Sequence, residues 1–177
     1  MNYDFSQDHF RLFGLLPAFD IDPAPLEKTY REMQSQVHPD RFAHLGETER
    51  RLSMQWSTHV NEAYQTLKKP LSRACYLLQL NGVDALENSN TAMPAAFLMQ
   101  QMEWREAVMD AKAGRDVRAL EQLERELKDG AKVLTGSLQQ QLDVEKNYPA
   151  AGESVRKLKF LEKLMAEIHD AYEALES

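Results

Sequence analysis

Apolar side chains recur at alternating steps of three and four residues along most of this chain, and that spacing restricts its fold more than any other feature. The clearest run lies near the C-terminus and comprises Leu158, Leu161, Met165, Ile168, Tyr172 and Leu175. Such steps place side chains on one face of an α-helix. Valine, isoleucine and threonine are sparse beside leucine, alanine and glutamate, and glycine and proline number only 7 each, which also favours helix. The sequence therefore predicts an all-α fold.

The chain of 177 residues is long enough for two helical domains joined by a linker. Residues 81–93 are rich in turn-forming residues and have no clear period, and Pro94 suits the first turn of a new helix. We therefore expect a first domain over residues 1–80, a linker over 81–93 and a second domain over 94–177.

The first domain is expected to be a helical hairpin closed by minor helices. Its first long helix begins near Asp22 and ends near Val37, because Pro39 disfavours helical geometry in the residue before it. A polar loop then extends to about Gly46. The remaining helices are expected over residues 52–67, before Pro70, and over the short segments 10–15 and 71–78.

The second domain is expected to be an antiparallel bundle of three helices. They run over about 94–112, over about 116–145, and onwards from a turn at Asn147–Pro149. Gly130 and Gly136 lie inside the middle helix, where each costs about 1 kcal/mol relative to alanine, so the pattern allows a kink or a break there.

Charge and cysteine content argue against several classes of function. The net charge of −7 disfavours a general binder of nucleic-acid phosphates. The single cysteine, Cys75, rules out an internal disulfide framework and a multi-thiolate metal site. No apolar run approaches the roughly 20 residues that span a bilayer. The N-terminus lacks the pattern of a signal peptide, so we expect a cytoplasmic protein that binds no membrane.

No arrangement typical of a catalytic, metal or cofactor site stands out. The histidines are scattered at His9, His38, His44, His59 and His169. None belongs to a His-Glu-x-x-His motif, and the chain has no glycine-rich phosphate loop. We therefore expect a protein that is not an enzyme and that holds neither a metal nor a cofactor.

The tripeptide His38-Pro39-Asp40 is the most informative motif, because it opens the loop between the two amphipathic helices of the first domain. Pro39 fixes its own φ and pushes His38 towards extended geometry, so the motif holds an imidazole and a carboxylate at a rigid corner. An exposed carboxylate there is suited to a charge-assisted bond with a partner's arginine. On spacing alone, a simple helix-stop turn is the commoner explanation.

The helix expected from Pro94 carries more apolar residues than one small bundle can bury. One stripe consists of Phe97, Trp104 and Val108. A second consists of Leu98, Met99 and Met102 and is continued by Glu103 and Glu106. One stripe is therefore left for the first domain, a dimer partner or another bound protein. The second is typical of a docking face, since methionines adapt to a partner and acids select a basic rim, although a core position for Met102 remains an alternative.

Phe160 is a further apolar residue outside the expected core. At about 100° per residue it lies roughly 140° from Met165, on the far side of the last helix between Lys159 and Lys163. A surface position or a contact with the linker explains this placement of Phe160 as well as a binding role does.

The helix–tripeptide–helix segment resembles a J domain, the co-chaperone module that stimulates ATP hydrolysis by DnaK-type chaperones. Asp8–Leu15 resembles the opening of the HscB group of J proteins, and Ala96–Met99 and Val155–Leu161 resemble that group's C-terminal domain. The resemblance implies a J-domain hairpin followed by a three-helix bundle. It also implies a co-chaperone of iron–sulfur cluster assembly, which binds an IscU-like scaffold, delivers it to an HscA-like chaperone and stimulates ATP hydrolysis there.

The resemblance implies roles for individual residues as well. Those expected to bind the chaperone are His38, Pro39, Asp40, Lys28, Arg31 and Arg41. Those expected to bind the scaffold are Leu98, Met99, Met102, Glu103, Glu106 and Phe160. The helix before the tripeptide is less basic than in typical J domains, because Glu27 and Glu32 offset its two cations. This departure argues against stimulation of a general DnaK chaperone.

Three alternatives make different predictions. A general folding co-chaperone would bind unrelated unfolded proteins directly. An iron–sulfur or metal enzyme would hold metal or turn over a substrate by itself, which the single cysteine argues against. A purely structural adaptor would not need the tripeptide.

Overall fold

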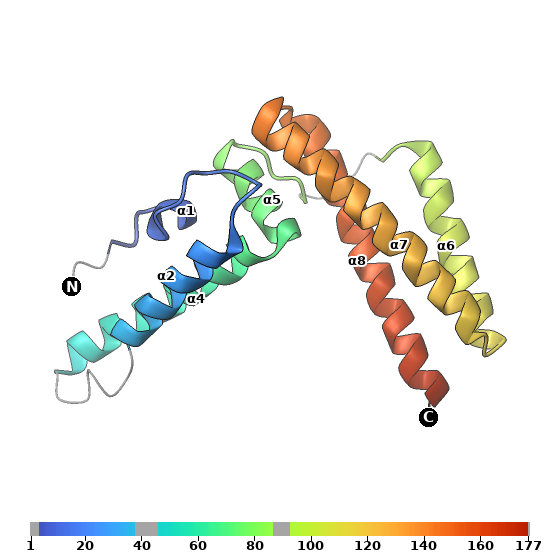
Figure 1. Cartoon of the computed structure of the whole chain (residues 1–177), viewed down its shortest axis with the longest axis horizontal. Coiled ribbons are helices and arrows are strands. Elements are labelled where there is room, and N and C mark those ends of the chain that lie inside the picture. Colours follow the sequence, from blue (N-terminus) through green and yellow to red (C-terminus); the bar gives the residue numbers. More distant parts are fainter. Residues whose placement is uncertain (1–3, 38–45, 87–92, 177) are drawn as a thin grey trace. The chain divides into compact units, whose positions relative to one another are not determined.

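The computed structural model describes residues 4–37, 46–86 and 93–176 of the chain (Figure 1). The elements are α1 (His9–Leu12), α2 (Pro23–Gln36), α4 (Glu47–Lys68), α5 (Pro70–Leu80), α6 (Ala95–Ala113), α7 (Val117–Gln139), η1 (Gln140–Val144) and α8 (Tyr148–Glu176). None of the described residues lies in a β-strand, and the predicted all-α fold is confirmed. Among these same residues, no helix combines the length and the apolar character needed to cross a membrane. The chain divides into two compact units, Met1–Leu77 and Leu78–Ser177.

The first unit is built on α2 and α4, which lie side by side as a helical hairpin (Figure 1). Asp22 begins α2 by accepting a hydrogen bond at 3.0 Å from the Ala24 N–H, and Pro23 occupies the first turn. The helix ends at Gln36, and the Val37 that follows is buried. Both ends agree with the bounds that the capping aspartate and Pro39 predict.

Two tyrosines fix the spacing of the hairpin. The rings of Tyr30 on α2 and Tyr64 on α4 are nearly parallel, with centroids 3.8 Å apart. The Tyr30 hydroxyl donates to Oδ1 of Asn61 at 3.0 Å and accepts from Nε2 of Gln34 at 2.9 Å. Stacked and hydrogen-bonded rings of this kind hold two helices in one register. The helices that flank the tripeptide loop are therefore held rigidly together.

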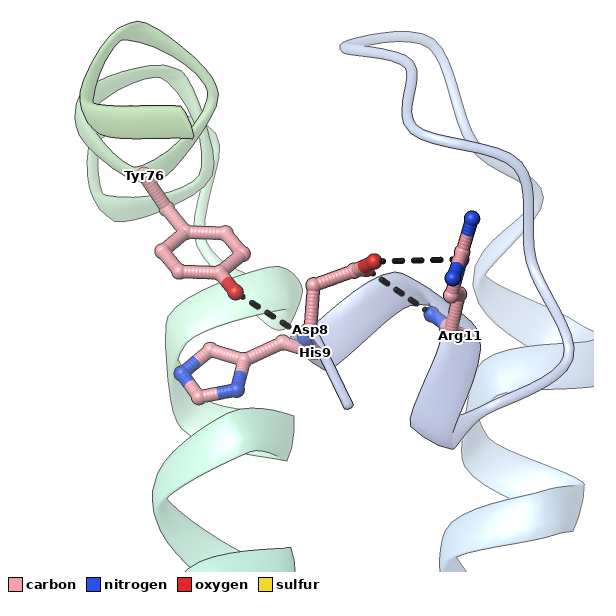
Figure 2. Close-up of polar contacts among 4 residues, drawn as sticks. All are labelled: Asp8, His9, Arg11 and Tyr76. Atoms are coloured by element: carbon pink, nitrogen blue, oxygen red, sulfur yellow. Dashed lines mark hydrogen bonds and ion pairs between the residues drawn. The ribbon is translucent and has the colours of Figure 1, made fainter. Parts of the chain in front are cut away.

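Figure 2 shows how α1 is attached to the same unit. The Asp8 carboxylate accepts a hydrogen bond from the Arg11 N–H at 3.0 Å and lies 3.5 Å from Nε of that residue. The backbone N–H of His9 donates to the Tyr76 hydroxyl at 3.0 Å, and the two rings stack with centroids 4.3 Å apart. The short leading helix is thus present, and Gly14, with a φ of +68°, follows its end. Much of the Asp8–Leu15 segment therefore has a structural role.

The second unit is the predicted bundle of three helices, α6, α7 and α8 (Figure 1). One cluster of its buried core consists of Val108, Ala111, Leu120, Leu123, Leu127, Leu161, Leu164, Ile168 and Ala171. The helices α7 and α8 supply most of these side chains. The longer pair therefore forms the body of the bundle, and α6 packs against it.

The middle helix is not interrupted where its glycines allowed a kink. α7 continues through Gly130 and Gly136, and a Cβ added at Gly130 would lie 3.3 Å from Cδ1 of Leu161 on α8. The missing side chain at Gly130 therefore lets α8 approach closely. The winding changes further on, where Gln140–Val144 form the π-helical segment η1.

The turn predicted at Asn147–Pro149 lies earlier in the chain and includes Asn147, because Tyr148 and Pro149 already belong to α8. The Asn147 side chain accepts a hydrogen bond from the Ala150 N–H at 3.2 Å, as an N-terminal cap does. Pro149 fits the first turn, where its missing N–H leaves no bond unmade. The chain reverses just before this cap, where Lys146 has a φ of 53°.

Candidate functional site

The loop expected to bind a chaperone lies outside the described residues. This applies to His38, Pro39, Asp40 and Arg41. The structure does describe the two ends of the loop, which are Val37 after α2 and Gly46 before α4. The stacked tyrosine pair holds these two helices together.

The other two residues expected to bind the chaperone, Lys28 and Arg31, are exposed on α2. The Arg31 guanidinium lies 2.6 Å from Oε1 of Glu27, one turn earlier. An exposed pair of this type contributes little to stability. It does offset the positive charge that Arg31 presents to a partner, in agreement with the weakly basic helix inferred from the sequence.

One side of α6 is apolar and exposed. Leu98 is 47% exposed, Met99 63% and Met102 72%. Glu103 and Glu106 are also exposed and border these side chains. We call these five residues the α6 face. The alternative that places Met102 in the bundle core is wrong.

The opposite side of α6 packs on α8 through an aromatic cluster of Phe97, Trp104 and Phe160. The Phe97 centroid lies 6.2 Å from that of Trp104 and 5.9 Å from that of Phe160, both edge to face. Trp104 and Phe160 stack at 6.4 Å with an interplanar angle of 19°. The first stripe of α6 therefore faces the bundle, while the second stripe is left exposed.

Phe160 is half-buried in this cluster, so its expected place on the outer side of the last helix is wrong. The apolar face expected from the sequence is centred on Met165, whereas the buried arc of α8 is centred on Leu161, Leu164 and Ile168. At about 100° per residue, Phe160 and Met165 then fall on opposite edges of that arc. Phe160 borders the core and is not part of the α6 face by packing alone.

Two cations cover the aromatic cluster. The Arg105 guanidinium lies 5.4 Å from the Phe160 centroid, and Nζ of Lys157 lies 5.6 Å from the Phe97 centroid. Lys157 also pairs with Glu153 at 2.6 Å. Cations over ring faces are attracted by the negative charge of the π-system. The cluster thus has a basic border on one side, and the α6 face has an acidic one.

Sequence reasoning missed Met109, which is 70% exposed on the same helix. It follows Met102 by seven residues, so the two side chains project from nearly the same side of α6. The heptad step was a usable signal. Met109 extends the apolar surface of the α6 face by two turns towards the C-terminal end of the helix.

Within residues 4–37, 46–86 and 93–176, no group of three histidine, cysteine, aspartate or glutamate side chains is arranged to hold a metal ion. The chemistry that these residues offer is that of recognition. It consists of an adaptable apolar surface with an acidic edge on α6, and a clamped helical hairpin that carries the tripeptide loop.

Comparison with known proteins gives matches that cover both the helical hairpin and the three-helix bundle. The sequence model of a family described as the HSCB C-terminal oligomerisation domain matches residues 93–169, which include all of the α6 face. A co-chaperone protein HscB homolog from Aromatoleum aromaticum is 52% identical over 177 residues, which is 100% of both chains.

Solved structures agree with this result. The chaperone HscB from Vibrio cholerae superposes with a TM-score of 0.84 at 36% identity, covering 96% of this chain and 99% of that one. Human co-chaperone protein HscB superposes with a TM-score of 0.87 at 31% identity, covering 94% of this chain and 82% of that one. The helical hairpin and the three-helix bundle are thus those of a J-type co-chaperone. The chain belongs to the HscB family of co-chaperones.

Proposed function

We propose that this chain binds an IscU-like iron–sulfur scaffold protein, delivers it to an HscA-like DnaK-type chaperone and stimulates ATP hydrolysis by that chaperone. In this proposal, the α6 face together with Phe160 receives the scaffold. The tripeptide His38-Pro39-Asp40, with Lys28, Arg31 and Arg41, contacts the chaperone. The protein is an adaptor and an ATPase activator, and the iron–sulfur cluster remains on the scaffold.

The exposed α6 face is the observation that carries the proposal. Burying a leucine or methionine side chain in an interface contributes about 1.5–3 kcal/mol, so three such residues suffice for a transient complex. Glu103 and Glu106 at the edge favour a partner with a basic rim. The membership of the chain in the HscB family supports a co-chaperone role for this surface.

The two sites act together through proximity. A scaffold held by one unit and a chaperone held by the other are brought to a high effective concentration, without any need for strong binding at either site. ATP hydrolysis in the chaperone then traps the scaffold. The pairing of Arg31 with Glu27 lowers the positive charge on α2, so in this proposal Asp40 and Arg41 carry more of the chaperone contact.

The proposal is tested by measuring the steady-state ATPase rate of the cognate HscA-like chaperone with wild-type protein and with Asp40→Asn. The amide keeps the size of the side chain but removes the charge that would bind a partner arginine, so we expect stimulation to be lost. The unfolding temperature should remain the same. Equal stimulation by Asp40→Asn would remove the chaperone part of the proposal.

A second candidate function for the α6 face is self-association, because the matching family is described as an oligomerisation domain. Sedimentation of the wild-type protein, alone and with the scaffold, separates the two. A monomer that forms a one-to-one complex supports scaffold binding. A stable dimer that Met102→Glu dissociates would favour self-association.

A further inference from the structure

The α6 face and its extension contain a group of exposed methionines. The methionines that are exposed among the described residues are Met54, Met99, Met102 and Met109. Met54 lies on α4 in the other unit, and the remaining three lie on α6. At about 100° per residue, Met99, Met102 and Met109 project within less than a quarter of the circumference of the helix. Exposed thioethers are therefore concentrated on the surface proposed to bind the scaffold.

The thioether is the side chain on this face with a ready oxidation reaction. When it meets a hydroperoxide, the peroxide O–O bond breaks, one oxygen atom forms an S=O bond, and the other leaves as water or an alcohol. The sulfur loses two electrons and the peroxide gains them. The product is methionine sulfoxide, a polar group that thiol-dependent reductases return to the thioether.

Oxidation makes the α6 face more polar, whereas docking depends on its apolar character. A sulfoxide oxygen is a strong hydrogen-bond acceptor that water satisfies in the free protein. An apolar interface would leave it without a donor, and that is unfavourable. Glu103 and Glu106 beside it offer acceptors and no donor at neutral pH. The bundle core is not altered, because these three side chains project away from it.

We propose that Met99, Met102 and Met109 form a peroxide-sensitive modification site, and that their oxidation to sulfoxides reversibly releases the scaffold. This inference rests on the proposed function of the α6 face. Scaffold already bound protects the site, because it covers the same side chains. Free protein is therefore oxidised before scaffold-bound protein, and the oxidised protein no longer binds scaffold for delivery to the chaperone.

The test compares four samples of three proteins: wild type, the triple variant Met99→Leu/Met102→Leu/Met109→Leu, the control Met54→Leu, and wild type repaired by a methionine sulfoxide reductase. Each is treated with hydrogen peroxide and desalted. A thiol reductant is then added, which restores Cys75 and leaves sulfoxides in place. Peptide mass spectrometry locates the oxygen atoms, and calorimetric titration with the cognate scaffold gives Kd.

We expect peroxide to weaken scaffold binding at least tenfold in wild type and in Met54→Leu. Peroxide should weaken scaffold binding by the triple leucine variant less than twofold relative to the same variant untreated. The reductase should restore the affinity of oxidised wild type. Prior addition of scaffold should slow oxidation of the three α6 methionines but not of Met54. Unchanged affinity of wild type oxidised at all three positions would overturn the inference. A loss of affinity in the peroxide-treated triple variant equal to that in wild type would overturn the inference as well.

The untreated proteins distinguish failure of this inference from failure of the proposed function on which it rests. If reduced wild type does not bind the scaffold at all, the proposed function fails, and the modification site fails with it. If reduced wild type binds and oxidised wild type binds equally well, only the modification site fails.

Discussion

The helices α7 and α6 lie in the same bundle but use their apolar residues differently. α7 buries Leu120, Leu123, Leu127 and Leu138 and keeps its outer side largely polar. α6 buries Val108 and Ala111 and exposes apolar side chains on the opposite side. Apolar area that is buried within the chain stabilises the fold, whereas a contiguous apolar surface that is left exposed is typical of a site of interaction. The comparison teaches that, in the proposed function, stability and recognition depend on different helices of one bundle.

The largest effect that separates the two helices is expected at Leu127, which is fully buried on α7. Leu127→Ala removes packed methyl groups and leaves a cavity, so it should lower the free energy of unfolding by about 2–5 kcal/mol. Met102→Ala, on the exposed side of α6, should change it by no more than about 0.5 kcal/mol. Urea unfolding followed by circular dichroism measures both. Similar losses for the two variants would show that α6 is not specialised for recognition.

A smaller effect distinguishes the two glycines of α7. Gly136→Ala adds a Cβ that meets nothing within 4 Å, so it should stabilise the protein by about 0.5–1 kcal/mol through helix propensity. Gly130→Ala gains the same propensity, but its Cβ would crowd Leu161, which is buried and has little room to move. Thermal unfolding should therefore rank Gly136→Ala above Gly130→Ala. The reverse order would mean that α8 does not approach α7 closely at Gly130.

The smallest effect concerns pH and the attachment of α1 in the first unit. Burial lowers the pKa of His9, and the nearby His59 lowers it further, whereas Asp8 and Glu62 act in the opposite direction. The Tyr76 ring stacks on the imidazole, with centroids 4.3 Å apart. A histidine whose folded pKa lies below its unfolded value of about 6.5 binds more protons when unfolded, so its stabilising contribution is present above that pH and is lost as pH falls.

The urea midpoint of wild type should therefore decrease between about pH 7.5 and pH 5.5. His9→Phe retains a ring that can stack on Tyr76 but does not titrate, so its midpoint should decrease less over the same range. A wild-type slope no steeper than that of His9→Phe would show that protonation of His9 does not oppose the docking of α1.

Local pattern predicted much of this architecture. Helix bounds near Asp22, Val37 and Pro70 follow from caps and prolines, and these are properties of a few neighbouring residues. The exposed stripe on α6 was also predicted, because a helix with two apolar sides cannot bury both. The placement of Phe160 was not, because its burial depends on Phe97 and Trp104 from a distant segment. Such contacts are set by packing between helices, which periodicity within one helix does not contain.

The expected chaperone-binding tripeptide stays a prediction, since it lies outside the described residues. The start of α8 shows a different limit. The residues Asn147, Tyr148 and Pro149 are all frequent in turns, yet asparagine also caps helices and proline also begins them. Composition alone does not distinguish the two uses, and the packing of α8 on α7 decides between them.

The most direct test of the central claim is the affinity of the cognate IscU-like scaffold for Met99→Ala/Met102→Ala, measured by calorimetric titration beside wild type. Met54→Ala is the matched control, because Met54 is 71% exposed but lies on α4. The account predicts Kd at least tenfold weaker for the double variant, unchanged Kd for Met54→Ala, and the same unfolding temperature for all three proteins. Equal affinity of the double variant and wild type would contradict it.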